Sequence, residues 1–434
     1  MRFLGIGETC DLGDVYHRLR QSGHEVRVYI DEPRAHDIYA GLLHRIHDWR
    51  SELSWIRHAG KDGIILFESA IRGELQDELR QAGYQVIGGS AYGDRLENER
   101  EFGQETLRDL GLGIVQSHRF TNFSSAIDFI RQSPGRYVFK LNDANSARTK
   151  NYIGEMDSGT DMMAFLHLQK SQWRENWLPD FVLMEYVEGI EVGVGAFFNG
   201  EEFLRPILVD FEHKRFFPGE LGELTGEMGT VVTYRGGDRI FELSLALMQN
   251  VLREHGYLGY INLNLIANKQ GLWPLEFTSR FGYPGSIISE ALHDEPWESI
   301  FCKLLRRDSL EFVTRSGFAT GIVLTVPTFP YEQGYEELGK GTPIFFRDNM
   351  TPENLNHVRL GEVGLQDGQF VTSGLNGYVG VATGVGPSVE ESARKAYEVA
   401  RKIVAPNLRY RNDIGERVIN GGWSGLGQLG YLAE

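Results

Sequence analysis

The stretch that decides the fold reads YINLNLIANKQGLWPLEFTSRFGYPG and covers residues 260–285. Its first part, 260–271, alternates apolar and polar residues and closes in a turn, which predicts the first strand of a β-hairpin. In the second strand, Glu276 stands near the exit, and Arg280 comes two residues before the Gly and Pro turn. The pattern therefore predicts a functional site at a strand end, with an acidic and a basic side chain close together.

Composition limits what the protein can be. The chain has 434 residues, 41% of them apolar, which suits about three domains with separate cores. Its net charge of -16 argues against a nucleic-acid surface built on bulk charge and favours small molecules as partners. The two cysteines, Cys10 and Cys302, have neither disulfide nor zinc-ligand spacing. With no signal peptide or membrane-length apolar run, we expect a soluble cytoplasmic protein, monomeric or homodimeric.

Strand and helix patterns divide the chain into three regions. Residues 1–95 alternate strand and helix signals, which predicts a parallel sheet wrapped by helices, an α/β domain. After one charged helix at 95–114, alternation dominates residues 96–314, with a small strand-rich lobe near 117–187. Residues 315–434 read as a separate α+β cap with one helix at 389–404. The glycine-rich tail at 420–434 is expected to be mobile unless Trp423 and Tyr431 dock it.

Several segments carry residues suited to phosphoryl transfer from ATP, which needs cations aimed at phosphates and carboxylates for metal. Lys140 ends an apolar strand; alone it would be read as a snorkelling surface lysine. It is followed by NDANSARTK, in which Lys150 could close over a triphosphate. The run containing Glu185 and Val187 can present its backbone to an adenine edge, and Glu191 can reach ribose hydroxyls. Ordinary solvated acids in a hairpin are the alternative.

A basic patch and a metal site are predicted next to each other. The segment FEHKRFF gathers His213, Lys214 and Arg215 between apolar residues, which suits an anion. Glu276 is a candidate Mg²⁺ ligand, because magnesium prefers oxygen ligands and needs only one or two carboxylates. Neutral oxygens could come from Asn264 and Thr278. Arg280 offers a rigid fork for a phosphate or acyl phosphate.

These motifs occur together in a known family. The chain resembles the ATP-grasp ligases, most closely glycinamide ribonucleotide synthetase (phosphoribosylamine-glycine ligase), over nearly its whole length. The resemblance is carried by several segments in the family's order: MEYVEGIEVGV (184–194), EHKR (212–215), TGEMG (225–229), GYLGYINLNLIANKQG (256–271), LEFTSRFGYPG (275–285), the run from VTSGLNGYVGV (371–381) to the helix at 389–404, and RNDIG (411–415).

The resemblance implies a fold, a reaction and a set of roles. The fold would be an N-terminal Rossmann-like pre-ATP-grasp domain, an ATP-grasp domain at 96–314 and a C-terminal capping domain. The enzyme would use ATP and Mg²⁺ to join a small-molecule carboxylate to an amine through an acyl phosphate. Matching positions assign four roles. The ATP contacts would be Arg100, Lys140, Lys150, Glu185, Val187 and Glu191, and the metal ligands would be Glu276, Thr278 and Asn264. The catalytic cations would be Arg280, Lys214 and Lys140, and the substrate contacts would be His213, Arg215, Thr225, Glu227 and Tyr283.

The departures from the family pattern concern the substrates. The N-terminal turn reads GETCDLGD, where Asp11 and Asp14 would repel a substrate phosphate. Tyr283 and Gly285 replace two acids of the family's RFGDPE motif. We therefore expect a glycinamide ribonucleotide synthetase-like ligase with an altered substrate. The alternatives are a genuine phosphoribosylamine-glycine ligase of purine biosynthesis, and a nucleotide-binding pseudoenzyme with a glycine-free lid.

Overall fold

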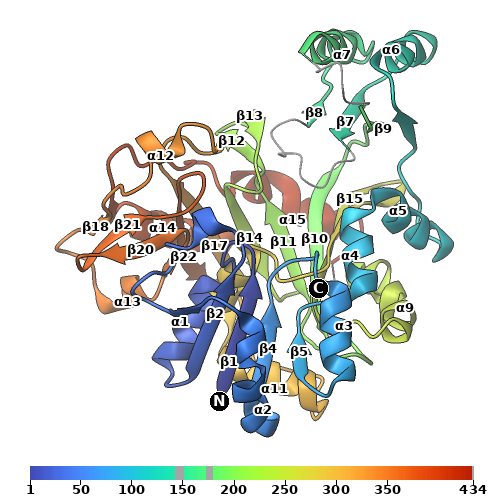
Figure 1. Ribbon diagram of the computed structural model, residues 1–434. Helices are drawn as coiled ribbons and strands as arrows, with labels where there is room; N and C mark the ends of the chain where they lie inside the picture. Colours follow the sequence, from blue (N-terminus) through green and yellow to red (C-terminus); the bar gives the residue numbers. More distant parts are fainter. Residues whose placement is uncertain (142–150, 173–178, 433–434) are drawn as a thin grey trace.

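The computed structural model describes residues 1–141, 151–172 and 179–432, whose arrangement is shown in Figure 1. The chain begins with a parallel sheet in the order β3-β2-β1-β4-β5. This confirms the predicted N-terminal α/β unit; the short strand β3 was not among the predicted strands. The strands are β1 (Arg2–Gly7), β2 (Glu25–Ile30), β3 (His44–Ile46), β4 (Gly63–Phe67) and β5 (Gln85–Ile87), and the helices are α1 (Gly13–Gln21), α2 (Leu53–His58) and α3 (Gly73–Gln81).

Two helices connect this sheet to the rest of the chain. The sequence predicts one helix over 95–114, but the structure has α4 (Ala91–Asn98) and α5 (Arg100–Asp109). The chain breaks at Glu99, whose φ of -100° and ψ of 84° lie outside the helical region. The expectation of a single helix is wrong. The sequence gives no signal of the break, because neither Gly nor Pro stands at that point.

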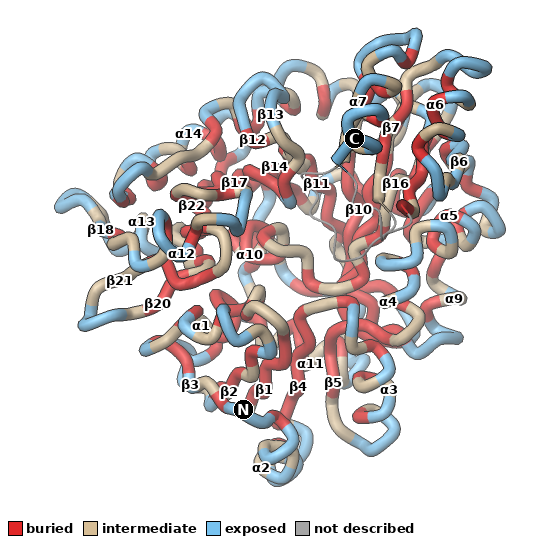
Figure 2. Tube along the Cα trace, turned by 45° about the horizontal axis from the view of Figure 1, so that its top comes forward, coloured by how far each residue is buried: buried red, intermediate tan, exposed pale blue. Residues whose placement is uncertain are grey.

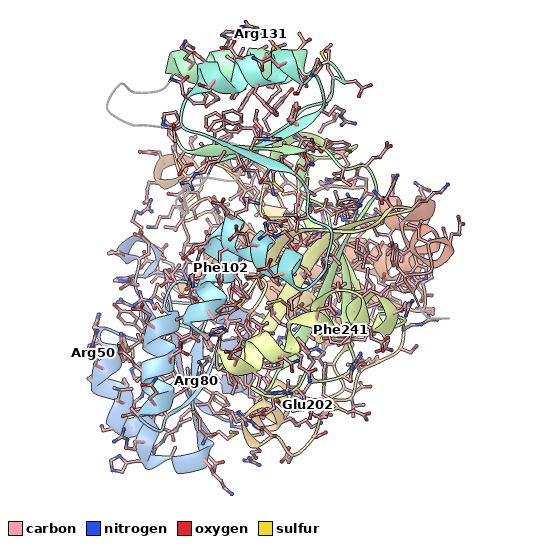
Figure 3. All side chains as sticks on the ribbon, turned by 90° about the vertical axis from the view of Figure 1, so that its right-hand side faces the viewer. Arg50, Arg80, Phe102, Arg131, Glu202 and Phe241 are labelled. Carbon is pink, nitrogen blue, oxygen red and sulfur yellow. The ribbon has the colours of Figure 1, made fainter. Side chains whose placement is uncertain are left out.

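The described residues between 117 and 185 form a small lobe that stands away from the other sheets (Figure 1). Its antiparallel sheet has the order β6-β9-β7-β8, and a core of buried residues, including Phe123, Phe139 and Phe181, lies between this sheet and two helices. Figure 3 shows Arg131 on the outermost helix of the lobe, far from the N-terminal sheet. The elements are β6 (Ser117–Phe120), α6 (Phe123–Gln132), β7 (Tyr137–Leu141), β8 (Tyr152–Ile153), α7 (Thr160–Gln172) and β9 (Phe181–Glu185).

A large sheet, in the order β16-β15-β10-β11-β14-β17-β22-β19, forms the centre of the molecule. The predicted hairpin of residues 260–278 is its β15–β16 pair, and this sheet is antiparallel throughout. Its elements up to residue 306 are β10 (Ile190–Phe198), β11 (Leu208–Glu212), β14 (Gly229–Thr233), β15 (Gly259–Asn268) and β16 (Gly271–Thr278), with the hairpin β12 (Arg215–Phe217) and β13 (Leu221–Leu224) and helices α8 (Asp238–Glu242), α9 (Gln249–Glu254), α10 (Gly285–Ser289) and α11 (Trp297–Arg306).

The C-terminal region continues this sheet. β17 pairs with β14, so the central sheet continues across the domain boundary expected at residue 315. A separate capping domain after this boundary stays a prediction. The helix predicted at 389–404 ends at Ala400. The elements are β17 (Phe318–Thr325), α12 (Tyr335–Leu338), β18 (Phe345–Phe346), α13 (Pro352–Leu355), β19 (Val358–Leu360), β20 (Val363–Gln366), β21 (Gln369–Thr372), β22 (Tyr378–Gly386), α14 (Val389–Ala400), β23 (Ile403–Val404) and α15 (Trp423–Gln428).

The glycine-rich tail is docked on the central sheet. The ring of Trp423 lies edge-on to Phe318 at 5.2 Å, and the Tyr431 hydroxyl donates to the Asn268 carbonyl at 3.2 Å. Figure 2 shows buried residues concentrated along the strands, with exposed residues on the helices and loops around them. Among the described residues, no helix combines the length and apolar character needed to cross a bilayer.

Candidate active site

A cleft of about 1190 Å³ separates the small lobe from one face of the central sheet. The lobe contributes residues of β7 and β9, and the sheet contributes residues of β10, β11, β15 and β16. Arg417, from the segment before α15, also lines it. The cleft therefore brings together stretches that are far apart in sequence.

The polar floor of this cleft follows from strand register. In β10 the glycines Gly193 and Gly195 alternate with buried valines, and they pair with Asn264 and Asn262 of β15. A side chain at Gly193 would collide with the Asp210 carboxylate, and one at Gly195 with the Tyr260 hydroxyl. The glycines thus leave room for polar side chains from the neighbouring strands to meet above β10.

Glu276 faces the cleft because β16 is irregular. β16 is the edge strand of the sheet, which tolerates Pro274. The register shifts there, with Asn264 opposite Glu276 but Leu265 opposite Pro274, so Leu275 is an extra residue. This β-bulge resets the alternation and puts Glu276 and Thr278 on the same face as Asn264.

Lys214 is the centre of the charge arrangement. Its Nζ lies 2.9 Å from Glu191 Oε1, 3.2 Å from Glu212 Oε2 and 3.5 Å from Glu276 Oε1. Burial alone would raise the pKa of Glu191, but the charges of Lys214 and Arg417 outweigh burial and hold that pKa below its usual value. Glu191 is therefore ionised at neutral pH, and one lysine contacts all three acids.

Lys140 approaches the same acids from the opposite wall. Its Nζ lies 3.8 Å from Glu276 Oε2, and its side chain is 14% exposed. Burial, together with the positive charge of Arg100, lowers the pKa of Lys140 to about 8. Arg100 also lines the cleft, so two cations from outside the central sheet face its acidic floor.

The segment predicted to bind adenine lies at the rim. Tyr186 stacks under the Arg136 guanidinium, 3.6 Å from the ring centroid, and its backbone N–H donates to the Arg136 carbonyl. The N–H of Glu185 donates to the Gln116 carbonyl. Among the described residues, no backbone bond uses the N–H of Val187. Apolar side chains line the cleft around this segment: Val115, Val138, Met184, Ile266 and Leu275.

The residues near Glu276 suit a hard cation. Asn264 is 6% exposed and its Oδ1 has no hydrogen-bond partner in the described part of the chain, while its Nδ2 donates to Glu191. In the same part, no three His, Cys, Asp or Glu side chains are arranged to bind a metal ion together. Such a site matches Mg²⁺, which takes few protein carboxylates and completes its shell with phosphate and water oxygens.

The remaining predicted residues fall into three groups. Arg215 and Thr225 line the cleft beside Lys214, and the Thr225 hydroxyl donates to the Lys214 carbonyl at 2.9 Å. Glu227, Tyr283 and Arg280 do not line it; Arg280 Nε lies 3.3 Å from Glu97 Oε1 at one end of it. Lys150 lies outside the described residues.

His213 does not belong to a cationic patch. It is fully buried, its pKa is lowered to about 3 by burial and by nearby Arg417 and Arg411, and its Nε2 accepts the N–H of Gly415. The neutral ring holds the C-terminal segment against β11. The expectation of a charged His213 facing a substrate is therefore replaced by a packing role.

Asp14 also differs from its predicted role. Its Oδ2 lies 2.9 Å from Arg18 Nε and 3.5 Å from Arg359 Nη1, and it is 3% exposed. The neighbouring arginines neutralise it, so Asp14 would not repel a phosphate. Asp11 has no such ion pair with any described residue. Burial raises its pKa, with opposing contributions from Thr9 and Arg280.

Sequence reasoning missed two residues of the cleft and a third residue directly behind them. Glu212 and Arg417 line it, and the Arg417 guanidinium donates to the Glu212 carbonyl at 2.6 Å. Asp210 lies behind them, 4% exposed and bonded to Asn262 Nδ2 at 2.6 Å. The signal in the sequence was the alternation DFE in β11, which puts Asp210 and Glu212 on one face.

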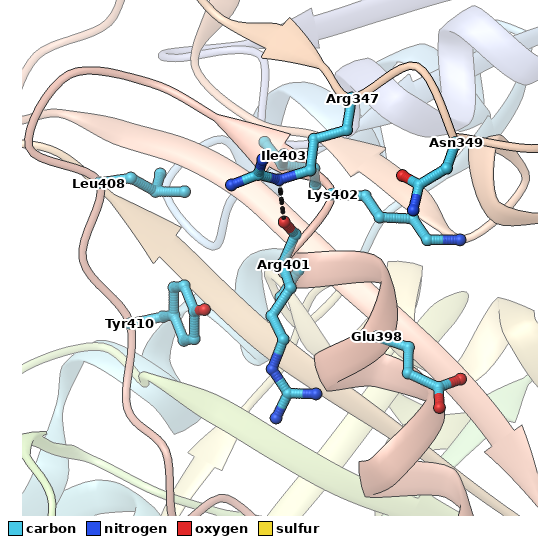
Figure 4. Close-up of a pocket in the computed structure, with 9 residues that line it drawn as sticks. Arg347, Asn349, Glu398, Arg401, Lys402, Ile403, Leu408 and Tyr410 are labelled. Carbon is cyan, nitrogen blue, oxygen red and sulfur yellow. Dashed lines mark hydrogen bonds between the residues drawn. The ribbon is translucent and has the colours of Figure 1, made fainter.

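A second hollow lies on the C-terminal region (Figure 4). Its volume is about 660 Å³, and it shares no lining residue with the cleft. Arg347 Nε donates to the Arg401 carbonyl at 2.9 Å, and Lys402 stands beside them. Its charged side chains are largely solvated, so it lacks the paired and buried charges found in the cleft.

Comparisons with known proteins agree with this geometry. Residues 98–286 match the family model described as phosphoribosylglycinamide synthetase, ATP-grasp (A) domain. These residues form an ATP-grasp domain of that family. The whole chain is 26% identical to the phosphoribosylamine–glycine ligase of Neisseria meningitidis serogroup B, over 97% of this chain and 100% of that protein.

Solved structures share the ATP-grasp fold. The phosphoribosylamine–glycine ligase of Thermotoga maritima superposes with a TM-score of 0.72 at 22% identity, covering 95% of this chain and all of that one. The biotin carboxylase domain of a Hydrogenobacter thermophilus 2-oxoglutarate carboxylase, solved with MgADP and bicarbonate, gives a TM-score of 0.65 at 10% identity, covering 100% of this chain and 99% of that one. The predicted fold and family are thereby confirmed.

Proposed function

We propose that this ATP-grasp ligase joins a carboxylic acid to an amine through an acyl phosphate, using ATP and Mg²⁺. The observation that carries the proposal is the meeting of Lys140, Glu276 and Lys214 across one cleft, at 3.8 Å and 3.5 Å. Phosphoryl transfer depends on positioning and charge neutralisation, and this arrangement offers both.

The nucleotide would lie between the lobe and the sheet. The N–H of Val187, which no backbone bond uses in the described part of the chain, and the carbonyl of Glu185 suit the hydrogen-bonding edge of adenine, and the apolar lining suits its faces. Glu191, held by Lys214 and Asn264, suits ribose hydroxyls. Lys140 and Arg100 would face the phosphates.

A magnesium ion would be held by Glu276, with neutral oxygens from Asn264 and Thr278. When bound, it would neutralise charge on the phosphates. Lys214 contacts both Glu276 and Glu191, so it acts as a positioning residue. Arg280, whose pKa is raised by Glu97 and Asp11 against the effect of burial, stays charged and suits the transferred phosphoryl group.

The reaction has two balanced steps. A carboxylate oxygen of the acid attacks the γ-phosphorus of ATP; a P–O bond forms, the bond to the β-phosphate oxygen breaks, and ADP leaves. The amine nitrogen then attacks the acyl carbon; a C–N bond forms, the C–O bond to phosphate breaks, and the nitrogen loses a proton.

The second candidate is a genuine phosphoribosylamine–glycine ligase. The match over 97% of the chain to a protein of that name favours it. Asp11 and Tyr283, which stand where the family pattern differs, argue for another substrate pair.

Trapping the acyl phosphate with hydroxylamine tests the proposal. The protein is incubated with MgATP, hydroxylamine and a panel of amino acids and small carboxylic acids, and hydroxamate and ADP are measured. We expect hydroxamate with at least one acid, in a 1:1 ratio to ADP. MgATP binding without hydroxamate from any acid would contradict the ligase and support a nucleotide-binding pseudoenzyme. Stimulation by glycine with phosphoribosylamine alone would favour the second candidate.

A further inference from the structure

The side chain of Gln104 connects helix α5 to the bulge that turns Glu276 toward the cleft. Its Nε2 donates to the Pro274 carbonyl at 3.1 Å and to the Leu275 carbonyl at 3.2 Å, and the residue lines the cleft. Pro274 and Leu275 form the irregular part of β16, directly before Glu276. The amide of Gln104 therefore contacts the part of the backbone that sets the direction of the Glu276 side chain.

Both hydrogen bonds depend on the bulge. Successive carbonyls of a regular strand point to opposite sides of it, so a single nitrogen does not reach two of them. At Pro274 and Leu275 the register shifts, and both carbonyls of this edge strand point toward Gln104. The two bonds would be lost if β16 became regular. Gln104 therefore stabilises the bulged form of β16 relative to a regular strand.

Close packing of α5 fixes the position of Gln104. The residue is 7% exposed and stands in the middle of α5, which lies beside β16 (Figure 2). The preceding residue, Gly103, permits this approach, because a Cβ there would lie 2.7 Å from the Leu96 carbonyl oxygen and 3.5 Å from the Phe277 ring. A side chain buried between closely packed elements has few alternative conformations, so the two hydrogen bonds are held in place.

Filling a gap between α5 and β16 would not require an amide. The Oε1 of Gln104 is buried and has no hydrogen-bond partner in the described part of the chain. A buried acceptor without a partner costs free energy that an apolar side chain of the same size would avoid. The amide supplies two hydrogen bonds to the bulge, which an apolar side chain cannot make. These bonds are the reason to assign Gln104 a role beyond packing.

Helix α5 also carries a cation of the cleft. Arg100 stands four residues before Gln104, and both side chains line the cleft. Residues four apart lie on the same side of a helix. One helix therefore presents the cation assigned to the phosphates and holds the strand that carries the acid assigned to the metal.

We propose that Gln104 is a positioning residue for the metal site. Its two hydrogen bonds hold the bulge of β16 and thereby orient Glu276 toward a magnesium ion bound with the nucleotide. Residues that orient a metal ligand affect metal affinity without contacting the metal. The inference rests on the proposed function, in which Glu276 is the magnesium ligand. Loss of the two bonds should weaken nucleotide binding with magnesium and leave binding without magnesium unchanged.

Calorimetry of the full chain with ADP tests this inference. The measured quantity, called the magnesium ratio, is the ADP affinity with magnesium divided by the affinity in EDTA. Gln104→Met keeps the length of the side chain and removes the donor. We expect it to lower the magnesium ratio about tenfold, with little change of the affinity in EDTA. Gln104→Asn is one methylene shorter and should lower the ratio similarly; it decides the matter if Gln104→Met does not fold.

Gln369 offers a matched control far from the cleft. Its Nε2 donates to the Ile344 carbonyl at 2.5 Å and to the Phe370 carbonyl at 3.1 Å, and it does not line the cleft. Gln369→Met therefore loses the same kind of hydrogen bonds and should keep the wild-type magnesium ratio. Thermal unfolding of the Gln104 and Gln369 variants measures the effect of each loss on stability.

A double variant shows whether Gln104 acts through Glu276. Glu276→Gln should lower the magnesium ratio by itself, and adding Gln104→Met should lower it no further, because the effects of coupled residues are not additive. Four results would each overturn the inference: a wild-type ratio in the Gln104 variants, an equal fall in Gln369→Met, an additional fall in the double variant, or no gain of ADP affinity with magnesium in the wild type.

The ligase reaction is tested separately, because the binding experiment contains no carboxylic acid. Hydroxamate formation by the wild type, together with an unchanged magnesium ratio in the Gln104 variants, would leave the ligase proposal standing and remove the positioning role. A lowered ratio in these variants without hydroxamate from the wild type would have the opposite meaning. Gln104 would then position a metal ligand in a protein that binds nucleotide and forms no acyl phosphate.

Discussion

Lys140 and Glu276 face each other across the cleft, with 3.8 Å between Nζ and Oε2, although Lys140 belongs to the small lobe and Glu276 to the edge of the central sheet. Different features of the fold position these two side chains. Lys140 is buried in the lobe, and the bulge in β16 turns Glu276 toward it. A ligand with both phosphate and metal would contact the two walls at once.

Replacing Lys140 should weaken nucleotide binding without unfolding the protein. A hydrogen bond to a charged group contributes about 1.5–3 kcal/mol, so Lys140→Ala should lower MgADP affinity by at least tenfold. Stability should change little, because burial already disfavours the charge of Lys140. Titration calorimetry measures the affinity, with Lys170→Ala on α7 as the control. Wild-type affinity would show that Lys140 only packs at the strand end.

Neutralising Glu276 should stop metal-dependent turnover. Glu276→Gln keeps the size of the side chain but removes the charge that a divalent ion requires, and we expect ADP release to fall about a hundredfold or more. Lys214 stays paired with Glu191 and Glu212, so the fold should persist. Glu101→Gln, an exposed acid at the rim, should behave like the wild type. Magnesium-stimulated ADP release that survives in Glu276→Gln would exclude Glu276 as a ligand.

Removing Lys214 should destabilise the protein more than removing a surface lysine. Lys214→Gln leaves Glu191, Glu212 and Glu276 without their shared cation. Because these pairs are half-buried, we expect a loss of about 1–3 kcal/mol, between the values typical of exposed and of fully buried pairs. Lys395→Gln breaks an exposed pair with Glu391 at 3.1 Å and should cost less than about 1 kcal/mol. Urea unfolding followed by circular dichroism compares the two. Equal losses would mean that solvent already screens the Lys214 cluster.

The sequence predicted local structure well and long-range pairing poorly. The hairpin 260–278 and the N-terminal sheet follow from alternation and from short segments that carry their own turn signals. That β17 continues the sheet through β14 depends on pairing between distant segments, which no local pattern specifies. For this reason the region after residue 315 looked separate in the sequence.

The sequence predicted which types of residue form the site, but not which residues each of them contacts. Lys214 was expected to face an anion, yet the structure surrounds it with carboxylates from β10, β11 and β16. His213 and Asp14 were expected to act as charged groups, because the residues that surround them in the fold, Gly415 and Arg359, lie far along the chain. Charge at a site depends on such tertiary neighbours, and a sequence motif does not contain them.

Glu68 should make stability depend on pH. It is 2% exposed, and burial together with the charge of Asp11 raises its pKa to about 8, although it accepts the N–H of Asp11 at 2.8 Å. In the unfolded chain the Glu68 carboxyl ionises near pH 4.5. The free energy of folding therefore becomes less favourable as the pH rises from about 4.5 to about 8, and it changes little above pH 8.

Glu68→Gln should remove this dependence, since the amide does not titrate and can still accept the Asp11 N–H. Each pKa unit is worth about 1.4 kcal/mol, so the variant should gain a few kcal/mol relative to the wild type at pH 8.5 and little at pH 5. Denaturant unfolding across that range measures the difference, with Glu74→Gln on α3 as an exposed control. A constant offset between Glu68→Gln and the wild type at all pH values would mean that Glu68 is already ionised in the folded protein.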